Sequence, residues 1–377
     1  MATVIDPVVP SEIPLKDVEH ELDRQLKLAQ GPGEAPVVRA RMSNLIIYCD
    51  RPEDCAQIVA HVPDIVAIHP ARVLLLIIDP AADPGRISAS VQTRVHKINK
   101  GLRAFSEVVT LRTAAGSAMK LPFAVRRLLI GDLPTNLWFA ARQPPVMAGT
   151  LLYELAEGAS QVIYDSYGWP EPARGLTATA SWLERFERSI GQGHYRIASD
   201  LTWRRLKPWR RLVAEALDPA TAPGAFESVT EVLFDHGPHS VTSAWSLASW
   251  MSLRLAWQVV SVKVVPGSEV AWQFTSSSGL RSMRIRRIAN APRGIQWMRI
   301  GCTIGGQPGA LNLAPVDDRR LKIEPEGIPG TRRTVTAPTL GLAELVGRQL
   351  SDRERDTVFR ESMRVAQDLA ISVLKQS

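Results

Sequence analysis

Residues 129–145 read LIGDLPTNLWFAARQPP, and the apolar run Leu137–Ala140 within them is entered and left through prolines. Because proline restricts its own backbone and that of the residue before it, helix is disfavoured across either boundary. The short apolar run with two aromatic side chains therefore predicts a buried strand with a turn at each end. Asp132 and Arg142 then lie at opposite ends of this strand, where loops can use them. The alternative is a plain core strand.

Similar apolar runs recur on both sides of this strand, at residues 44–49, 72–78, 105–112 and 161–165. Helical patterns separate them at 52–61, 122–129 and 149–155, and a further helix carries Trp182 and Ile190. Strands buried on both faces that alternate with helices are typical of a parallel sheet. Residues 37–195 are therefore predicted to form an α/β domain with a mostly parallel sheet.

The first 36 residues are expected to hold a tail, a helix and a linker. Residues 1–10 form the tail, and an amphipathic pattern runs from Leu15 to Ala29. Gly31–Pro36 ends that helix and acts as the linker. Since a lone amphipathic helix is not stable by itself, it must dock on its own body or on a partner. We favour docking on its own body.

A strand is expected at 227–234, and beyond residue 256 the spacing of the apolar runs changes. Short strand-like runs at 257–265, 269–275, 281–288, 294–302 and 319–324 are separated by turns, which favours an antiparallel meander. A helix is expected at 240–255, and a final helix is expected to start at a capping box, Ser351–Glu354. Residues 196–377 are therefore predicted to form an α+β domain with an antiparallel sheet and a long C-terminal helix.

The composition is that of an ordinary globular chain, with 45% hydrophobic and 22% charged residues. A net charge of +7 permits an acidic partner, a phosphorylated ligand or nucleic acid without selecting one. Acidic and basic residues are mixed along the chain, which argues against a dedicated nucleic-acid arm. No apolar run reaches the ~18 residues of a membrane span, and the charged first thirty residues do not resemble a signal peptide. We expect a cytoplasmic protein that binds neither membrane nor nucleic acid.

The three cysteines, Cys49, Cys55 and Cys302, are odd in number and form no CxxC motif. They therefore predict neither a disulfide framework nor a structural zinc site. Cys49 and Cys55 are near enough in sequence for a redox pair to remain open. The favoured interpretation is one buried strand cysteine and one helix cysteine.

Sequence motifs of common enzymes are missing from the chain. There is no Gly-Lys pair and hence no Walker A loop, and no dinucleotide fingerprint, HExxH or GxSxG occurs. His236 and His239 lie together in a proline-containing turn, where turn or capping roles are favoured over metal binding. We therefore predict no catalytic residue, no metal and no cofactor, and a protein that is not an enzyme.

Residues 203–211 have the most unusual local composition, with five basic residues among nine and two tryptophans. Pro208 is expected to kink or restart the helix there. Arginine and tryptophan are favoured at protein interfaces, and the same mixture suits single-stranded nucleic acid or a small phosphate. A third interpretation is a surface helix whose tryptophans pack inward. We predict that the exposed-looking side chains of this segment contact a partner, namely Trp203, Arg204, Arg205, Trp209 and Arg210. Asp132 and Arg142 are predicted to lie at a supporting loop of the same contact site.

Five segments, in this order and spacing, point to a known family: Arg41–Tyr48, His69–Arg72, Gly131–Trp138, Val162–Ser166 and Asp200–Leu206. From residue 40 to the final helix the chain resembles the glucose-6-phosphate dehydrogenase assembly protein family, OpcA. The resemblance implies a non-catalytic partner of glucose-6-phosphate dehydrogenase that promotes its active oligomer and raises its activity, at the entry of the oxidative pentose phosphate pathway.

For cyanobacterial members of the OpcA family, the resemblance also implies redox control through cysteines. No cysteine follows residue 303 in this chain, so a C-terminal thiol switch does not carry over. The rival hypothesis from the residues is an α/β enzyme that binds a sugar phosphate or nucleotide. A nucleic-acid binder is the third, and it predicts binding that falls steeply with salt.

Overall fold

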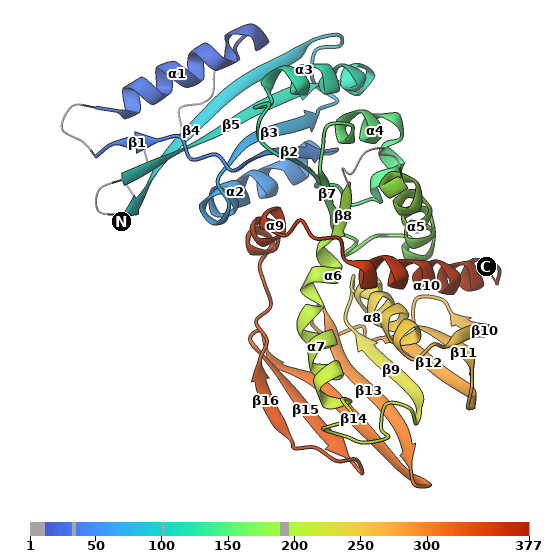
Figure 1. Ribbon diagram of the computed structural model, residues 1–377. Coiled ribbons are helices and arrows are strands. Elements are labelled where there is room, and N and C mark those ends of the chain that lie inside the picture. The colour runs from blue at the N-terminus through green and yellow to red at the C-terminus, as the bar shows by residue number, and fades with distance from the viewer. Residues whose placement is uncertain (1–11, 32–34, 100–101, 189–195, 377) are drawn as a thin grey trace.

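The computed structural model describes residues 12–31, 35–99, 102–188 and 196–376, which fold around two eight-stranded sheets, A and B (Figure 1). Three expectations lie outside the described residues: the tail at 1–10, the linker residues 32–34, and the place of Ile190 in its helix. The amphipathic helix is confirmed as α1 (Val18–Ala29). It docks on the body of the protein, where Val18 and Leu22 are fully buried.

Sheet A is mostly parallel, as predicted. Its strands are β1 (Val37–Val38), β2 (Ser43–Cys49), β3 (Ala71–Ile78), β4 (Ile87–Asn99), β5 (Leu102–Thr113), β6 (Thr135–Phe139), β7 (Gln161–Tyr164) and β8 (Ile197–Asp200). Their order is β1-β5-β3-β2-β6-β7-β8, and β4 pairs with β5 in the single antiparallel ladder described for this sheet. The predicted central strand is therefore β6, hydrogen-bonded to β2 and β7 on either side.

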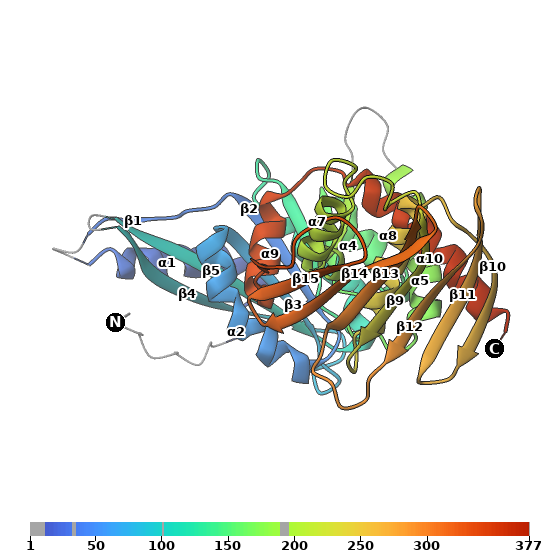
Figure 2. The same ribbon diagram turned by 90° about the horizontal axis from the view of Figure 1, so that it is seen from below.

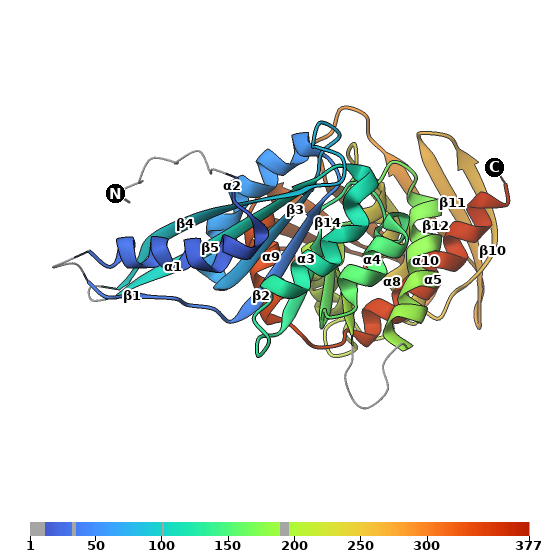
Figure 3. The same ribbon diagram turned by 90° about the horizontal axis from the view of Figure 1, so that it is seen from above.

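Helices cover both faces of sheet A because successive strand residues point to opposite faces. Leu137 packs on one face with α1, α3 (Leu121–Leu128), α4 (Thr150–Ala156) and α5 (Pro172–Arg188), which Figure 3 shows from above. Trp138 packs on the other face with α2 (Pro52–Ile68) and α9 (Leu342–Ser351). Both faces of the strand are thus buried, which is why Leu137, Trp138 and Phe139 are apolar without alternation.

Sheet B contains β9 (Val229–His236), β10 (Gln258–Val265), β11 (Glu269–Ser276), β12 (Gly279–Arg287), β13 (Ile295–Ile304), β14 (Gln307–Asp317), β15 (Arg320–Glu326) and β16 (Arg333–Thr336). Its order, β10-β11-β12-β9-β13-β14-β15-β16, places β9 in the middle and parallel to β12. The sheet is mostly antiparallel as predicted, but it is not a simple meander. The helix α8 (Val241–Arg254) separates β9 from the following strands in sequence and allows it to insert between them.

The predicted C-terminal helix is α10 (Thr357–Leu374). The predicted capping box is wrong: Ser351 ends α9, and the side chain of Asp356 caps α10 by accepting from Phe359 N. Helix α10 lies between α5 of the first half and α8 of the second (Figure 1). It therefore contacts the helices that cover both sheets.

The two faces of sheet B differ. Its inner face, with Trp272, Phe234 and Ile300, is buried with the helices. In Figure 2, α7 (Lys207–Ala216), α8 and α10 all lie on this side of the sheet. No described helix lies against the opposite side, which we call the open face.

The predicted domain boundary between residues 195 and 196 stays a prediction. The chain leaves sheet A at the end of β8, Asp200, and enters sheet B at the start of β9, Val229. Helix α9 then returns from sheet B to pack on α2. Over the ranges that the structure describes, the helices are too short or too polar to cross a bilayer.

Candidate functional site

The Trp/Arg segment forms α6 (Leu201–Arg205) and α7, and it joins the two halves of the molecule. Helix α6 begins at Asp200, whose carboxylate accepts from Thr202 N at 2.9 Å and so caps the helix. The helix breaks at Leu206 and restarts with Pro208 in the first turn of α7. The expected restart at Pro208 is confirmed.

Trp203 is buried and ties α6 to the start of α10. Its indole Nε1 donates to Asp356 Oδ2 at 2.8 Å. Its ring packs 5.4 Å from that of Phe359, measured between centroids. Since the other carboxylate oxygen of Asp356 caps α10, the two helix starts are held by one carboxylate.

Arg204 and Arg205 also make contacts inside the molecule, each with a different part of the chain. Arg204 Nη1 donates to Gln349 Oε1 on α9 and to Asp352 Oδ2, each at 2.8 Å. Arg205 Nη2 donates to Asp165 Oδ2 at 2.9 Å. The Arg205 guanidinium also lies 5.0 Å from the centre of the Tyr167 ring.

Arg210 lies over Trp203, with its guanidinium carbon 3.5 Å from the ring centre and Nη1 donating to Trp203 O at 2.7 Å. Burial lowers the pKa of Arg210 to about 10, with Asp356 opposing the shift. Trp209 is 8% exposed and packs with Leu212 and Val213 in the main core. The expectation that both tryptophans are exposed is wrong, because they pack inward as the third interpretation proposed. The partner-contact role of this segment stays a prediction.

Asp200 accepts three hydrogen bonds: from Thr202 N, Ser166 N and, at 2.6 Å, Ser166 Oγ. Burial, together with the nearby charge of Asp165, raises the pKa of Asp200 to about 7, although the hydrogen bonds from Ser166 and Thr202 act in the opposite direction. Two of the family-like segments, Val162–Ser166 and Asp200–Leu206, therefore meet at the ends of neighbouring strands.

The turn after β9 closes onto this cluster. Ser240 Oγ lies 3.3 Å from Tyr167 Oη and accepts from Gly294 N at 2.7 Å. His236 is buried, with Nδ1 2.8 Å from Gly237 O, and burial lowers its pKa. Within the described ranges, no group of three His, Cys, Asp or Glu residues is arranged to hold a metal.

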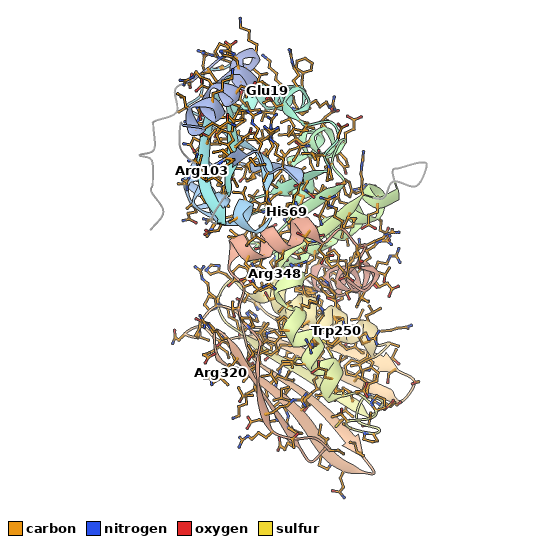
Figure 4. All side chains as sticks on the ribbon, turned by 60° about the vertical axis from the view of Figure 1, so that its left-hand side comes forward. Glu19, His69, Arg103, Trp250, Arg320 and Arg348 are labelled. Atoms are coloured by element: carbon orange, nitrogen blue, oxygen red, sulfur yellow. The ribbon has the colours of Figure 1, made fainter. Side chains whose placement is uncertain are left out.

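The other family-like segments also hold the fold. Asn44 binds the loop before β6 through both amide atoms, each 3.0 Å from a backbone atom of Ile130, and this loop carries the exposed Asp132. His69 lies 3.1 Å from Ser43 Oγ and 3.1 Å from Ser351 Oγ, beside α9 (Figure 4). These polar side chains fix loops and helices in place and do not line a cleft.

Arg142 lies at the other end of β6, at the point where sheet A reverses its order. With the antiparallel β4 set aside, β2 to β8 leave six parallel strands, and their order across the sheet is third, second, first, fourth, fifth, sixth. In doubly wound sheets of this order, dinucleotides bind in the crevice outside the carboxyl ends of the first and fourth strands. Here those strands are β2 and β6, and exposed Arg142 reaches from beyond β6 to pair with Asp54 on α2.

The residues of this crevice do not fit a dinucleotide. The turn from Cys49 to Asp54 contains no glycine, so the backbone approach that a pyrophosphate needs is lacking. Asp50, Glu53 and Asp54 place carboxylates around the first turn of α2, where pyrophosphate charge would lie. Gln143 Nε2 donates to Asp50 Oδ2 at 3.1 Å and helps to close the crevice.

Cys49 and Cys55 are buried neighbours near this end of β2, one on β2 and one on α2, as the favoured interpretation predicted. Hydrogen bonding from Cys49 lowers the pKa of the Cys55 thiol, and the same bond raises that of Cys49. Both are buried and free, as is Cys302. Their use as a redox pair stays a prediction.

Sequence reasoning missed the acceptors of the Trp/Arg segment. The sequence pattern assigns Asp352 to a capping box and singles out neither Gln349 nor Asp356. All three lie about 150 residues away from α6 in sequence, so no local spacing connects them. One usable signal is charge: residues 203–211 include five basic side chains and no acidic one, which indicates distant partners.

Two regions of the chain match the two domains of one family. Residues 62–181 match the domain described as the N-terminal domain of the glucose-6-phosphate dehydrogenase subunit. Residues 196–363 match the domain described as the C-terminal domain of that same subunit. The matches follow each other in the order that the domain names require.

Two curated relatives are named putative OxPP cycle protein OpcA. The protein of Synechocystis sp. is 25% identical over 325 residues, which cover 83% of this chain and 66% of the relative. That of Nostoc punctiforme is 29% identical over 205 residues, which cover 54% of this chain and 42% of the relative. The chain thus spans less than two thirds of the length of either relative.

Among solved structures, an oxidoreductase from Sinorhizobium meliloti superposes with a TM-score of 0.50. The match covers 90% of this chain and 98% of that one, at 12% identity. At this identity the likeness shows the fold alone, because one fold hosts many activities.

Proposed function

The chain belongs to the OpcA family of glucose-6-phosphate dehydrogenase assembly proteins, and from this premise we propose that it is a non-catalytic partner of that dehydrogenase. It binds the enzyme, promotes its active oligomer and raises its activity in the oxidative pentose phosphate pathway. The observation that carries the proposal is the ordered match of both family domains over residues 62–181 and 196–363.

The mechanism we propose is a population shift. A protein that binds the active state of an enzyme more tightly than the inactive state moves the equilibrium by the difference in binding free energy. Such a partner works best when its own surface keeps one shape. The internal bonds of Arg204, Arg205 and Trp203 support this, because they fix α6 against α9, α10 and the end of β7.

The contact residues remain a proposal, and the structure divides them into two groups. Trp203, Arg204, Arg205, Trp209 and Arg210 are held by intramolecular contacts, so their effect on the dehydrogenase includes positioning of α6 and α7. Asp132 and Arg142 are exposed at the two ends of β6. A test of direct contact is therefore cleaner at these two residues.

The function is tested by titrating the chain into glucose-6-phosphate dehydrogenase from the same cell and following NADP reduction and sedimentation together. We expect activity and the fraction of large oligomer to rise with the same concentration dependence. Activity and oligomer distribution that stay constant, under conditions where the dehydrogenase alone dissociates, would falsify the proposal.

The contact site is tested by Asp132→Lys, with Asp83→Lys as the matched exposed control. We expect the first change to weaken binding to the dehydrogenase at least tenfold without changing the melting temperature, and the second to leave binding unaltered. Equal binding of both variants removes Asp132 from the contact site and leaves the proposed function standing.

The rival function is a sugar-phosphate- or nucleotide-binding enzyme, and the doubly wound strand order of sheet A is the observation in its favour. Opposing it are the carboxylates of Asp50, Glu53 and Asp54 at the crevice. A melting experiment on the purified chain separates the two proposals. A shift with NADP or glucose 6-phosphate alone supports the rival, whereas a shift only with the dehydrogenase supports the assembly role.

A further inference from the structure

We propose that the open face of sheet B is the surface through which two copies of this chain bind each other. The inference does not depend on the dehydrogenase. The registers of the sheet place every second residue of each strand on the side away from α7, α8 and α10.

Three adjoining rows of side chains make up the centre of the open face. One row crosses seven strands from Lys263 through Arg284 and Leu233 to Glu324. A second row runs parallel to it from Ser261 through Ser282 and Glu231 to Glu326. The third includes Arg286, Asp235 and Trp297 across the middle strands.

The residues of these rows are partly or fully exposed except Gly301 and Ala310. They contrast with the inner face, where Trp272, Met283, Val232 and Ile300 occupy the intervening positions and are buried. Leu233, Trp297, Ala271 and Ala314 leave apolar surface among the charges of the open face. An uncovered central region with apolar and small side chains between polar ones resembles the composition of a protein interface.

The charges of the open face are balanced, unlike those of the whole chain. Its central rows carry five basic and five acidic residues: Lys263, Arg284, Arg286, Arg299 and Lys322, and Glu231, Asp235, Glu269, Glu324 and Glu326. The chain as a whole carries +7, so two copies repel each other on average. A face on which both signs are equally represented is where that repulsion is smallest and where a twofold partner can match opposite charges.

Several of these charges already form pairs across strands. Arg286 binds Asp235 through two bonds of 2.8 and 2.9 Å. Arg299 Nη1 donates to Glu326 Oε2 at 2.9 Å. Paired side chains have lost part of their conformational freedom already, so less entropy remains to be lost when a second copy binds.

The size of the face suits a dimer of moderate affinity. Eight strands about 4.8 Å apart, each with about seven residues in the sheet, present roughly 700–800 Å². A standard specific interface uses about 800 Å² of each partner. The occupant that the balanced charge and this area fit is therefore a second copy of the chain, and we expect a dissociation constant in the micromolar range.

Sedimentation velocity of the purified full chain tests the proposal without any partner protein. We expect a concentration-dependent monomer–dimer equilibrium that weakens as salt is raised. Ala314→Glu places a carboxylate on the open face beside Lys322, its neighbour in the register, so the sheet itself tolerates it. This variant should raise the dissociation constant at least tenfold, whereas Ala60→Glu on the exposed side of α2 should leave it unchanged.

Ser282→Arg supplies a second, independent variant, since its cross-strand neighbour Glu231 can accept the new charge. It should weaken the dimer as Ala314→Glu does, with a far-ultraviolet spectrum and melting temperature like those of the wild-type chain. A chain that stays monomeric at about 100 µM in low salt overturns the proposal. So does a dimer that both open-face variants leave intact.

Discussion

Trp203 connects α6 to the start of α10 through one hydrogen bond to Asp356. Trp203→Phe removes the indole N–H and keeps an aromatic ring against Phe359. We expect a loss of about 2 kcal/mol in the free energy of unfolding, because a bond to a charged acceptor and some packing disappear together. Urea unfolding measures this loss.

Trp209→Phe is the matched control, because no hydrogen bond of the Trp209 indole is described although the ring is 8% exposed. It should cost about 1 kcal/mol, from packing alone. Equal losses in the two variants contradict a stabilising role for the Trp203–Asp356 bond.

Asp200 makes stability depend on pH in an unusual direction. Its folded-state pKa is raised to about 7 from an ordinary value of 3.8. Between these two values the folded chain holds a proton that the unfolded chain has released, so this residue favours folding most at low pH. Its contribution is lost as pH rises from about 4 to about 7.

Asp200→Asn keeps an acceptor for Thr202 N and Ser166 N and cannot ionise. In the wild-type chain, the contribution of Asp200 to the free energy of unfolding decreases between pH 4 and pH 7. We expect this decrease to be absent from the variant. Chemical unfolding at several pH values measures it for both proteins. A profile of the variant that is parallel to that of the wild type rules out titration of Asp200 in this range.

At the scale of residues, the sequence shows which segment is unusual but not which residues its side chains contact. The inward packing of Trp203 and Trp209 is one of three interpretations that the sequence allows, and nothing local decides among them. Their environment depends on α9 and α10, which lie more than a hundred residues further along the chain. Asp132 and Arg142 were placed correctly at the ends of one strand, because prolines define those ends within a few residues.

At the scale of elements, Gly347 sets how closely α9 approaches α2. A Cβ atom at this position would lie 2.8 Å from Cβ and 2.9 Å from Cγ2 of Ile68. Gly347→Ala gains about 1 kcal/mol of helix propensity, but overpacking costs about 1–3 kcal/mol. We expect a net loss of about 1 kcal/mol in thermal or urea unfolding.

Gly158→Ala serves as the control, since nothing lies within 4 Å of a Cβ placed there. It should leave stability unchanged or slightly raised. A stabilised Gly347→Ala would show that α9 can shift on α2 at little cost.

Elements with a strong apolar pattern were predicted and weakly apolar ones were not. β2, β3 and β6 are buried on both faces and stand out as continuous apolar runs. β4 was missed because Ile87–Asn99 mixes serine, threonine and charged residues, and its ladder is with β5 at the edge of the sheet. The short strands β8 and β16 have four residues each, too few for a periodic pattern. The insertion of β9 between β12 and β13 depends on long-range pairing that no local motif encodes.

At the scale of the whole molecule, Glu187 connects the two halves. Its side chain is 2% exposed on α5 and pairs with Arg355 and with Arg360 of α10. Glu187→Ala removes the carboxylate that Arg355 and Arg360 share on α5, while the packing of α10 on α8 is untouched. We expect the amide hydrogens of α5 to exchange at a lower denaturant concentration than those of α8. The two halves of the molecule would then unfold as two cooperative units instead of one.

Hydrogen exchange followed by mass spectrometry measures this separation. Glu171→Ala is the control, because its pair with Arg174 is largely exposed and contributes little. In the wild-type chain and in this control, the amide hydrogens of α5 and α8 should exchange at the same denaturant concentration. A Glu187→Ala protein that also exchanges in one step shows that other contacts of α10 suffice to couple the halves.

The position of α9 and α10 also has a consequence for synthesis on the ribosome. The apolar surfaces of α2 and α5 are complete once residue 188 has emerged, yet the helices that cover them occupy residues 342–374. These surfaces therefore stay exposed while more than 150 further residues are translated. The nascent chain should therefore be a client of chaperones during that interval, and a ribosome stalled before residue 342 should present a protease-sensitive first half.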